Sequence, residues 1–325
     1  MSAGGSLFVE APARLHFGVL DLRGSLGRRF GGLGAAIPNP SLLLEAQPDR
    51  IVSAEGPDAA RAAAYARRVL AHHRIMGGAR LRVHKMIPAH SGLGSGTQLG
   101  LAVARALAEL YRLPDDAPAL ARAVGRGQRS AIGTWTFALG GFIVEGGRRT
   151  GSDSLAPLLA RYPVPEHWRC VVAIPRGHPG LSGEAEAAAF ERLPAPAVSE
   201  VERVAHLVLM QLLPALVEGD LAGFGVALSA VQRITGAWFA EQQGGVFAPG
   251  LSETLVARMA EWGAAGVGQS SWGPSVYGLV DGDVEARNLA ARVEAFLQGE
   301  GLVYRGEFAR AGARIRRGEQ TPCPD

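Results

Sequence analysis

Residues 87–100 read IPAHSGLGSGTQLG, a proline followed by a glycine-rich turn and the start of an apolar run. The stretch before it, ARLRVHKMI (79–87), alternates with the period of two that is typical of a β-strand. The stretch after it, TQLGLAVARALAELYRL (97–113), gathers apolar residues on one helical face. A strand, a glycine loop and a helix in this order predict an anion site, because N–H groups at a helix start lack partners and the helix dipole is positive there.

Two familiar versions of such a loop are excluded by the residues. A Walker-type loop needs Gly-Lys-Ser/Thr, and the chain's lysine, Lys85, lies before the loop. A dinucleotide fingerprint needs a third glycine where this chain has Thr97. In the remaining pattern, P-x-x-x-G-L-G-S-G, Ser95 or Thr97 is expected to cap the helix. The alternative is that SGLGSG is only a tight turn. The candidate phosphate-binding residues are Ser91, Gly92, Leu93, Gly94, Ser95, Gly96 and Thr97.

Composition narrows the class of protein. The chain has 325 residues, enough for one large or two ordinary domains, and 47% hydrophobic with 19% charged residues is ordinary for a soluble enzyme. The net charge of +3 is scattered, with no basic run interleaved with aromatics, so no nucleic-acid partner is expected. Cys170 and Cys323 lie too far apart to indicate a disulfide framework or a metal site. Without a long apolar run or a signal pattern, we expect a cytoplasmic protein that does not enter a membrane.

Strand-like and helix-like segments are mixed in both halves of the chain, which predicts an α+β fold with two domains. We place a GHMP-type N-terminal domain at 1–155, with its phosphate-binding loop at 88–97, and a C-terminal α+β domain at 165–325. The boundary falls in the loop-like stretch 148–167. The stretch RGQRSAIGTWTFALGG (126–141) is interpreted as a loop before a strand.

The glycine loop resembles the phosphate loop of the GHMP kinase superfamily. The similarity extends along most of the chain, because APARLHFG (11–18) and GVGQSSWGPSVYGLV (266–280) stand where those kinases carry their first and third motifs. The resemblance implies the GHMP-kinase fold. Its N-terminal α/β domain would contain the phosphate loop within a βαβ unit, and its C-terminal domain would be ferredoxin-like.

The motifs also depart from the kinases. Arg14 replaces their lysine, and His16-Phe17-Gly18 replaces their Gly-Glu-His. Where several of them carry a catalytic aspartate, the run from Arg129 to Ile143 has no carboxylate at all. The third motif is bulky, with Gln-Ser-Ser-Trp at 269–272. These changes indicate that the phosphate cradle was kept while the chemistry changed.

The replacements are similar to those of one subfamily, the β-ribofuranosylaminobenzene 5′-phosphate synthases. ARLHFGVLDL with GRRFGGLG, GRGQRSAIGTWTFALGGFIVEGG, HPGLSGEAEAAAF and GQSSWGPSVYGL carry the resemblance together. It implies condensation of phosphoribosyl pyrophosphate with 4-hydroxybenzoate or 4-aminobenzoate, releasing carbon dioxide and pyrophosphate, in tetrahydromethanopterin biosynthesis. It further implies Mg²⁺ as cofactor, no use of ATP, and a homodimer.

Residue roles follow as hypotheses. Arg14 and His16 share one strand edge at a spacing of two, and would contact a carboxylate, a phosphate or the phenol. These assignments have structural alternatives. His16 and Trp272 could be core residues, and Asp21 could be a turn former. Arg126 and Arg129 could be surface partners of carboxylates, and Glu184 and Glu186 could mark a helix start. The candidate catalytic residues are Arg14, His16, Asp21, Arg129 and Ser130; the candidate substrate-binding residues are Arg126, Gln269, Ser270, Ser271 and Trp272; and Glu184 and Glu186 are the candidate metal ligands.

Three function hypotheses remain. The first is the phosphoribosyl-transferring synthase. The second is an ATP-dependent GHMP small-molecule kinase of the sugar, homoserine or mevalonate type. The third is a non-catalytic protein that binds a phosphorylated metabolite or a protein partner. The carboxylate-free run from Arg129 to Ile143 favours the first over the second.

Overall fold

The large sheet is built on one long antiparallel hairpin. A computed structural model describes residues 5–177, 180 and 183–318, although not the side chains of 184 and 185. In it, β1 (Ser6–Asp21) pairs along most of its length with β2 (Arg28–Asp49). The sheet has the order β12-β1-β2-β4-β3, and β5, β6 and β7 join it through β2 and β5. The added strands are β3 (Ser53–Glu55), β4 (Gly78–Lys85), β5 (Phe142–Glu145), β6 (Arg148–Arg149), β7 (Leu158–Tyr162) and β12 (Arg314–Gly318).

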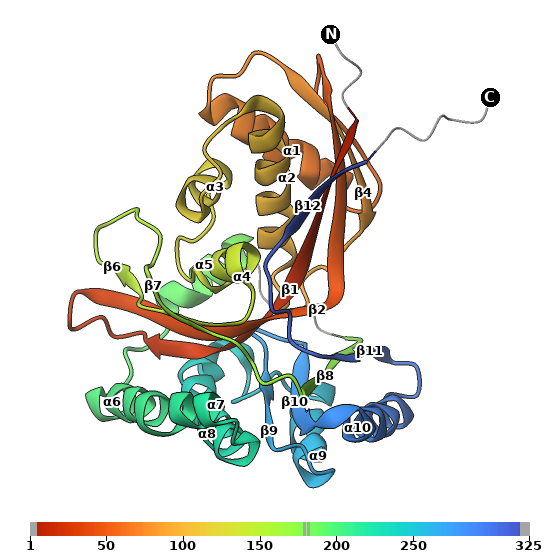
Figure 1. Cartoon of the computed structure of the whole chain (residues 1–325). Coiled ribbons are helices and arrows are strands. Elements are labelled where there is room, and N and C mark those ends of the chain that lie inside the picture. The colour runs from red at the N-terminus through yellow and green to blue at the C-terminus, as the bar shows by residue number, and fades with distance from the viewer. Residues whose placement is uncertain (1–4, 178–179, 181–182, 319–325) are drawn as a thin grey trace.

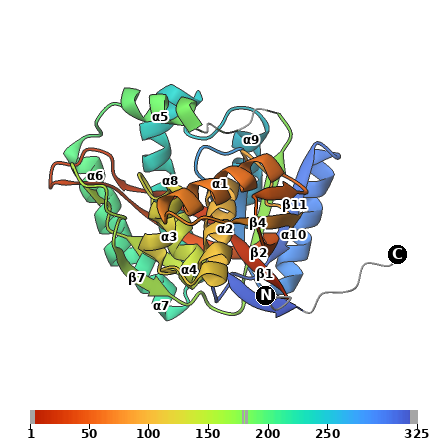
Figure 2. The ribbon, with the colours of Figure 1, turned by 90° about the horizontal axis from the view of Figure 1, so that it is seen from above.

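Helices cover one face of this sheet. Figures 1 and 2 show α1 (Ala59–His72), α2 (Ser95–Tyr111), α3 (Ala117–Val124) and α4 (Ile132–Leu139) gathered on that side. Helix α2 lies at the centre of the group, and eleven of its residues are buried because α1, α3, α4 and the sheet surround it. The parallel pair β3 and β4 is connected by α1, so the chain completes a β-α-β unit before it enters the glycine loop.

The second sheet has the order β11-β8-β10-β9, which is fourth, first, third and second along the chain. With helices after its first and third strands, this is the β-α-β-β-α-β arrangement of ferredoxin-like domains, so the predicted α+β class and C-terminal fold are confirmed. Its strands are β8 (Trp168–Pro175), β9 (Gly266–Gln269), β10 (Val276–Asp281) and β11 (Gly301–Gly306). The helical segments are α5 (Gly183–Arg192), α6 (Val198–Leu207), the π-helix η1 (Val208–Leu212), α7 (Leu213–Glu218), α8 (Leu221–Gln243), α9 (Leu251–Glu261) and α10 (Gly282–Leu297).

An aromatic cluster joins the two halves. Phe17 of β1 packs edge-on against Tyr277 of β10 with ring centroids 5.0 Å apart, and stacks on Phe142 of β5 at 5.8 Å. Phe224 of α8 contacts Phe142 and Trp168, at 5.8 and 5.0 Å. The opposite face of the second sheet packs on α9 and α10 through a separate apolar cluster. One face of the second sheet is therefore buried against the large sheet, which fixes the cavity between the halves.

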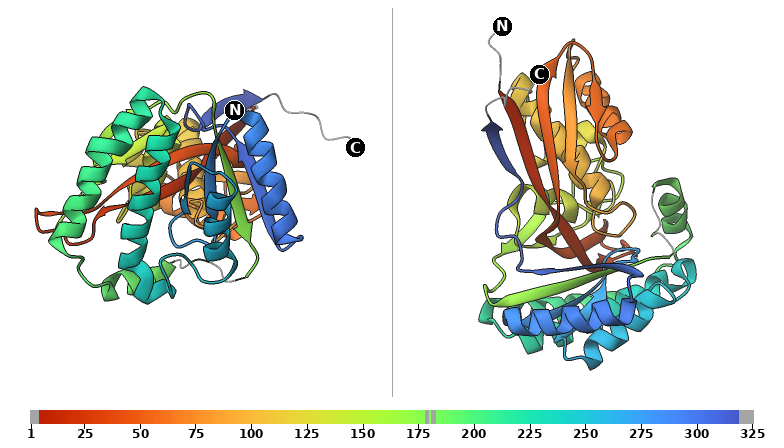
Figure 3. Two further views of the ribbon diagram at one scale, coloured as in Figure 1. Left: turned by 90° about the horizontal axis from the view of Figure 1, so that it is seen from below. Right: turned by 90° about the vertical axis from the view of Figure 1, so that its right-hand side faces the viewer.

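The chain crosses between the halves more than once. Residues 301–306 pair in the second sheet, yet β12 returns to the edge of the large sheet beside β1. Figure 3 shows this strand in blue beside the red β1. The division at 1–155 and 165–325 stays a prediction, and the sheets do not follow it strictly, since β7 and β12 both lie in the large sheet. In the described part of the chain, no helix combines the length and apolar character needed to cross a membrane.

Local structure differs from the prediction in one stretch of the N-terminal half. The stretch 126–141, interpreted as a loop, contains α4, whose mostly apolar residues lack the periodicity that identifies an amphipathic helix. The end of the long β2 and the short β3 follow one another along the chain. Long-range pairing with β1 holds β2 together across Pro38 and Pro40, and local sequence does not report that pairing.

The Tyr277 hydroxyl gives a test of this packing. It is buried and has no hydrogen-bond partner among the described residues, a situation that costs about 1–3 kcal/mol. We expect Tyr277→Phe to keep or raise the free energy of unfolding by about 1 kcal/mol. Tyr277→Ala should lower it by about 3 kcal/mol or more, because a ring-sized cavity opens beside Phe17. Denaturant unfolding measures both; a loss in Tyr277→Phe matching that in Tyr277→Ala would contradict this packing.

Candidate active site

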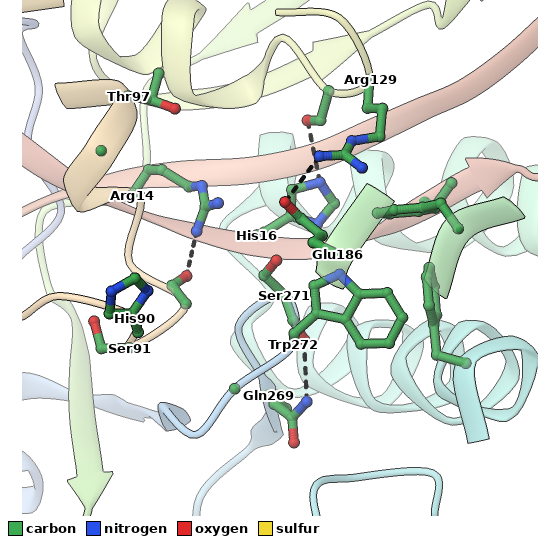
Figure 4. Close-up of a pocket in the computed structure, with 18 of the residues that line it drawn as sticks. Arg14, His16, His90, Ser91, Thr97, Arg129, Glu186, Gln269, Ser271 and Trp272 are labelled. Atoms are coloured by element: carbon green, nitrogen blue, oxygen red, sulfur yellow. Dashed lines mark hydrogen bonds and ion pairs between the residues drawn. The ribbon is translucent and has the colours of Figure 1, made fainter. Parts of the chain in front are cut away.

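A cavity of about 440 Å³ lies where the glycine loop, β1, α8 and the loop after β9 meet. It is lined by Arg14 and His16 from β1, by residues of the glycine loop, by the segment 125–130, and by Trp272. Figure 4 shows these side chains converging from both halves of the chain. The structure thus brings together most of the residues that the sequence singled out, although they come from distant segments.

The Ser270 hydroxyl connects the segments that form this cavity. It accepts a hydrogen bond from the His16 backbone N–H at 3.0 Å and donates one to the Gly92 carbonyl at 2.7 Å. Two backbone bonds continue the connection, from Arg14 N to Leu93 O at 3.1 Å and from Ser275 N to Ser91 O at 3.2 Å. Ser270 and Leu93 are fully buried and do not line the cavity, so they position the loop rather than touch a ligand.

Two glycines are required by this close approach. Gly92 has φ +80°, and a Cβ there would lie 2.2 Å from the Ser270 carbonyl oxygen. Gly94 has φ +81°, and its Cβ would meet the Arg14 side chain at 3.1 Å. The loop is therefore held between β1 on one side and the loop after β9 on the other.

The first turn of α2 forms the end of the cavity that could bind an anion, and it is called the anion-binding end below. Its N-cap residue is Gly94, and no side-chain cap bond is formed within the described chain, so the prediction that Ser95 or Thr97 caps the helix is wrong. The uncapped N–H groups remain open to a ligand. Two arginines stand over this turn, since a Cβ on Gly96 would lie 3.0 Å from Arg126 Nη2 and 3.4 Å from Arg61 Nη1.

Both arginines are held in place by neighbours. Arg126 donates from Nε to the Tyr65 hydroxyl at 3.0 Å and lies over that ring. Arg61 pairs with Asp58, while its buried Nε lacks a partner among the described residues. An unpaired guanidinium N–H beside a positive helix end fits a phosphate oxygen. Arg61 was not singled out from the sequence, because an arginine within an alanine-rich helix carries no motif.

Arg14 extends from β1 beneath the glycine loop and donates to the Gly92 carbonyl. Burial lowers its pKa to about 10, and the negative charge of Glu186 opposes that shift. Arg14 thus stays protonated at neutral pH. A partly desolvated cation beside the helix start adds positive charge where a phosphate would lie.

His16 is neutral over the physiological range. Burial and the adjacent positive charge of Arg14 lower its pKa to about 3. Its Nδ1 accepts from the Gly18 backbone N–H at 3.4 Å, so the proton is placed on Nε2, which lies 3.2 Å from Ser130 Oγ. The bulge between His16 and Gly18 turns the strand at this point, as bulges beside functional sites commonly do.

A buried carboxylate completes this polar group, and the sequence did not identify it. Glu145 ends β5 with no exposed surface, and accepts from Ala131 N at 3.2 Å and from Gly147 N at 2.8 Å. The Ser130 hydroxyl lies near enough to lower the pKa of this carboxyl. Glu145 lies two residues beyond the carboxylate-free run, and the turn after α4 folds it back beside that run. The available signal was a charged residue at the end of an apolar strand, in FIVEGG.

Aromatic side chains form the opposite wall. Trp272 packs edge-on against Phe190 and Phe239, with ring centroids at 5.5 and 4.9 Å, and all three line the cavity. Arg129 lies 4.8 Å from the Phe190 ring centroid and pairs with Glu186 at 2.9 Å. Trp272 lines the cavity, and its contact with a substrate stays a prediction. Phe190 and Phe239 were not singled out because they lie in ordinary helical sequence.

Other predicted residues have different places. Gln269 lines the cavity, but its side-chain amide forms hydrogen bonds with Ala248, Gln243 and Ser271. It therefore holds the loop after β9 in place. Asp21 lies outside the cavity, where its Oδ1 accepts from Arg23 N and Gly24 N at 2.6 and 2.9 Å as a turn former. The predicted catalytic role of Asp21 therefore has no geometric support.

Glu184 and Glu186 are the predicted metal ligands. The Glu184 side chain lies outside the described part of the structure, while Glu186 is the single carboxylate of the described cavity lining. Among the described residues, no cluster of three or more His, Cys, Asp or Glu side chains could hold a metal ion. A protein-only metal cage is thus absent from these residues.

Comparison with known proteins agrees with this geometry. The family model described as GHMP kinases N terminal domain matches residues 59–141, and GHMP kinases C terminal matches residues 212–299. The chain is 38% identical over 296 residues to the beta-ribofuranosylphenol 5'-phosphate synthase of Methanothermobacter thermautotrophicus, covering 85% of this chain and 89% of the relative. It is 34% identical over 295 residues to the protein of that name from Archaeoglobus fulgidus, covering 85% and 88%.

A solved structure shows the same fold. Homoserine kinase from Cytophaga hutchinsonii superposes with a TM-score of 0.68 over 97% of this chain and 99% of the kinase, at 19% identity. This likeness confirms the predicted GHMP-kinase fold and says nothing of the reaction.

Loss of the Ser270 hydroxyl should loosen the glycine loop. Ser270→Ala leaves the buried His16 N–H unpaired, and we expect the free energy of unfolding to fall by about 1–3 kcal/mol. Ser271 is the neighbouring serine, and none of the described hydrogen bonds involves its hydroxyl. Ser271→Ala should therefore change the free energy of unfolding by less than about 0.5 kcal/mol. Denaturant unfolding of the two variants measures the difference. Equal stability of the two variants would show that the hydroxyl does not hold the loop.

Proposed function

Since the chain belongs to the family of the beta-ribofuranosylphenol 5'-phosphate synthases, on the GHMP kinase fold, we propose that it transfers a phosphoribosyl group from phosphoribosyl pyrophosphate to 4-hydroxybenzoate. The products would be the carbon-linked ribofuranosylphenol phosphate, pyrophosphate and carbon dioxide. The observation that carries this proposal is one cavity with an anion-binding end at α2 and an aromatic wall at Trp272.

The anion-binding end supports a diphosphate donor. The first-turn N–H groups of α2, together with Arg14, Arg61 and Arg126, would hold the diphosphate and stabilise the negative charge that grows on it as the bond to ribose breaks. These donors are fixed before the reaction by the Ser270 connection and by Tyr65. The departing group therefore meets donors that are already oriented.

The aromatic wall supports the acceptor. Stacking of 4-hydroxybenzoate on Trp272 and its neighbours would direct the carbon that carries the carboxylate toward the ribose carbon. The phenol oxygen donates electron density to that carbon, which attacks the ribose as pyrophosphate leaves. Loss of carbon dioxide then restores the aromatic ring. The protein's tasks are alignment and placement of charge.

Glu186 would hold Mg²⁺ together with the substrate. Proteins commonly hold Mg²⁺ with one or two carboxylates and substrate phosphates, and Glu186, which pairs with Arg129 at 2.9 Å, is the carboxylate of the described cavity lining. A bound Mg²⁺ would supply neutralisation of diphosphate charge. The cytoplasmic location and the homodimer stay predictions.

The kinase hypothesis has less support. The relatives named above are synthases, and the likeness to homoserine kinase at 19% identity shows the fold alone. The described cavity lining also contains no lysine, so a phosphate there would be held by arginine and backbone N–H groups. No observation favours a non-catalytic role.

A product assay tests the proposal. The purified protein, given phosphoribosyl pyrophosphate, Mg²⁺ and 4-hydroxybenzoate labelled with ¹³C at the carboxylate, should release labelled carbon dioxide and pyrophosphate in equal amounts without ATP. Mass spectrometry and a pyrophosphate assay follow both products. ATP hydrolysis that requires an alcohol acceptor, with no carbon dioxide released, would replace this proposal with the kinase.

Two substitutions should separate the ends of the cavity. Arg126→Ala should raise KM for phosphoribosyl pyrophosphate by about 10-fold, because a charge-assisted bond to phosphate is lost, and leave KM for 4-hydroxybenzoate nearly unchanged. Trp272→Leu should show the reverse, with KM for the benzoate raised by about 3- to 10-fold. Steady-state kinetics with each substrate varied in turn measures both. Equal effects on the two KM values would contradict the two-ended cavity.

A further inference from the structure

We propose that Glu145, acting through the Ser130 hydroxyl, accepts the phenol proton of the aromatic substrate during the reaction. This inference rests on the proposed function and deepens it. It assigns a proton path to a buried carboxylate that is not part of the cavity lining. It also gives a phenol substrate, in contrast to the corresponding amine, its own proton acceptor.

Geometry gives the path from the cavity to the carboxylate. Ser130 lines the cavity, and its hydroxyl lies near enough to Glu145 to lower the pKa of that carboxyl. Two further carboxylate contacts, from Ala131 N at 3.2 Å and Gly147 N at 2.8 Å, fix both oxygens. Ser130 therefore lies between the buried Glu145 and the cavity.

The donors around Ser130 leave one direction for its own proton. Its Oγ accepts from Ile132 N at 3.2 Å and from His16 Nε2 at 3.2 Å. The His16 proton is on Nε2 because Nδ1 faces the Gly18 N–H. The Ser130 O–H therefore points to Glu145 as its acceptor. A phenol that donates to Ser130 Oγ would replace one of two long contacts, at small cost.

The surroundings of Glu145 suit a base that works near neutral pH. Burial raises its pKa to about 7, while the bonds from Gly147, Ala131 and Ser130 act in the opposite direction. A general base is most effective when its pKa is close to the working pH. Charged or titratable side chains near it bond elsewhere: neutral His16 to Ser130, Arg28 to Gly147 O, Arg148 to Gln128 O, and Arg161 to Leu139 O.

The proton balance closes within one turnover. The phenol O–H proton passes to Ser130 Oγ while the Ser130 proton passes to Glu145, which becomes a neutral acid. The phenolate electron pair is delocalised to the carbon that bears the carboxylate, that carbon bonds to ribose, and pyrophosphate leaves with the electrons of the broken bond. The C–C bond to the carboxylate then breaks, its electrons return to the ring, and Glu145 gives the proton back to the phenolate through Ser130.

The test compares two acceptors in wild type, Glu145→Gln and Ser130→Ala. With 4-hydroxybenzoate, kcat/KM of the wild type should rise as pH rises through about 7, because the ionised form of Glu145 accepts the proton. Both variants should lose this rise, and above about pH 7 their kcat/KM should lie about 100-fold below the wild-type value. With 3,5-difluoro-4-hydroxybenzoate, whose phenol is already ionised at neutral pH, the loss should shrink to about threefold or less.

Controls separate the possible outcomes. Glu109→Gln changes a partly exposed carboxylate on α2 that pairs with Arg317 away from the cavity, and it should behave as the wild type. Ser130→Ala keeps the backbone bonds of Glu145, so it tests the path even if Glu145→Gln is poorly folded. Equal losses on both acceptors, or a retained rise through about pH 7 in Ser130→Ala, would overturn the proton path and leave the synthase function standing. Wild-type protein that releases no pyrophosphate or carbon dioxide from either acceptor would overturn both.

Discussion

The hydrogen bonds of one buried hydroxyl determine the relative positions of the catalytic parts. Ser270 stands between the backbone of His16 on β1 and the carbonyl of Gly92 in the glycine loop, and it comes from the strand-to-strand connection of the second sheet. Three segments that are far apart in sequence meet at this oxygen. Because the aromatic wall continues from the same connection at Trp272, the distance between the anion-binding end and the wall is set by the packing of the two halves.

Charged groups are distributed unevenly around the cavity. Arginines and the first turn of α2 make one end positive, while His16, in the middle, is kept neutral by burial and by Arg14. Glu145 holds the opposite charge behind Ser130, away from the surface. Burying ionisable groups costs stability, and the cost falls when a ligand of opposite charge arrives. This arrangement favours a substrate that is anionic at one end and exchanges a proton at the other.

The sequence predicted the parts that depend on local pattern. The strand, glycine loop and helix at 79–113 have short-range periodicity. Motif order predicted the fold class and singled out Trp272, which lines the cavity. The remaining features depend on long-range packing. Glu145 reaches Ser130 only because the turn after α4 reverses the chain, and Asp21 bonds its own turn instead of a ligand. Ser270 was expected to touch substrate, whereas tertiary contacts occupy its hydroxyl.

The central claim is that the first turn of α2 holds the diphosphate that leaves the sugar. A crystal structure with phosphoribosyl pyrophosphate and Mg²⁺ tests it most directly. The account predicts the diphosphate over the N–H groups of Ser95 and Gly96, with the anomeric carbon directed toward Trp272. A 5′-phosphate in that position, with the anomeric carbon turned away from the aromatic wall, would contradict it.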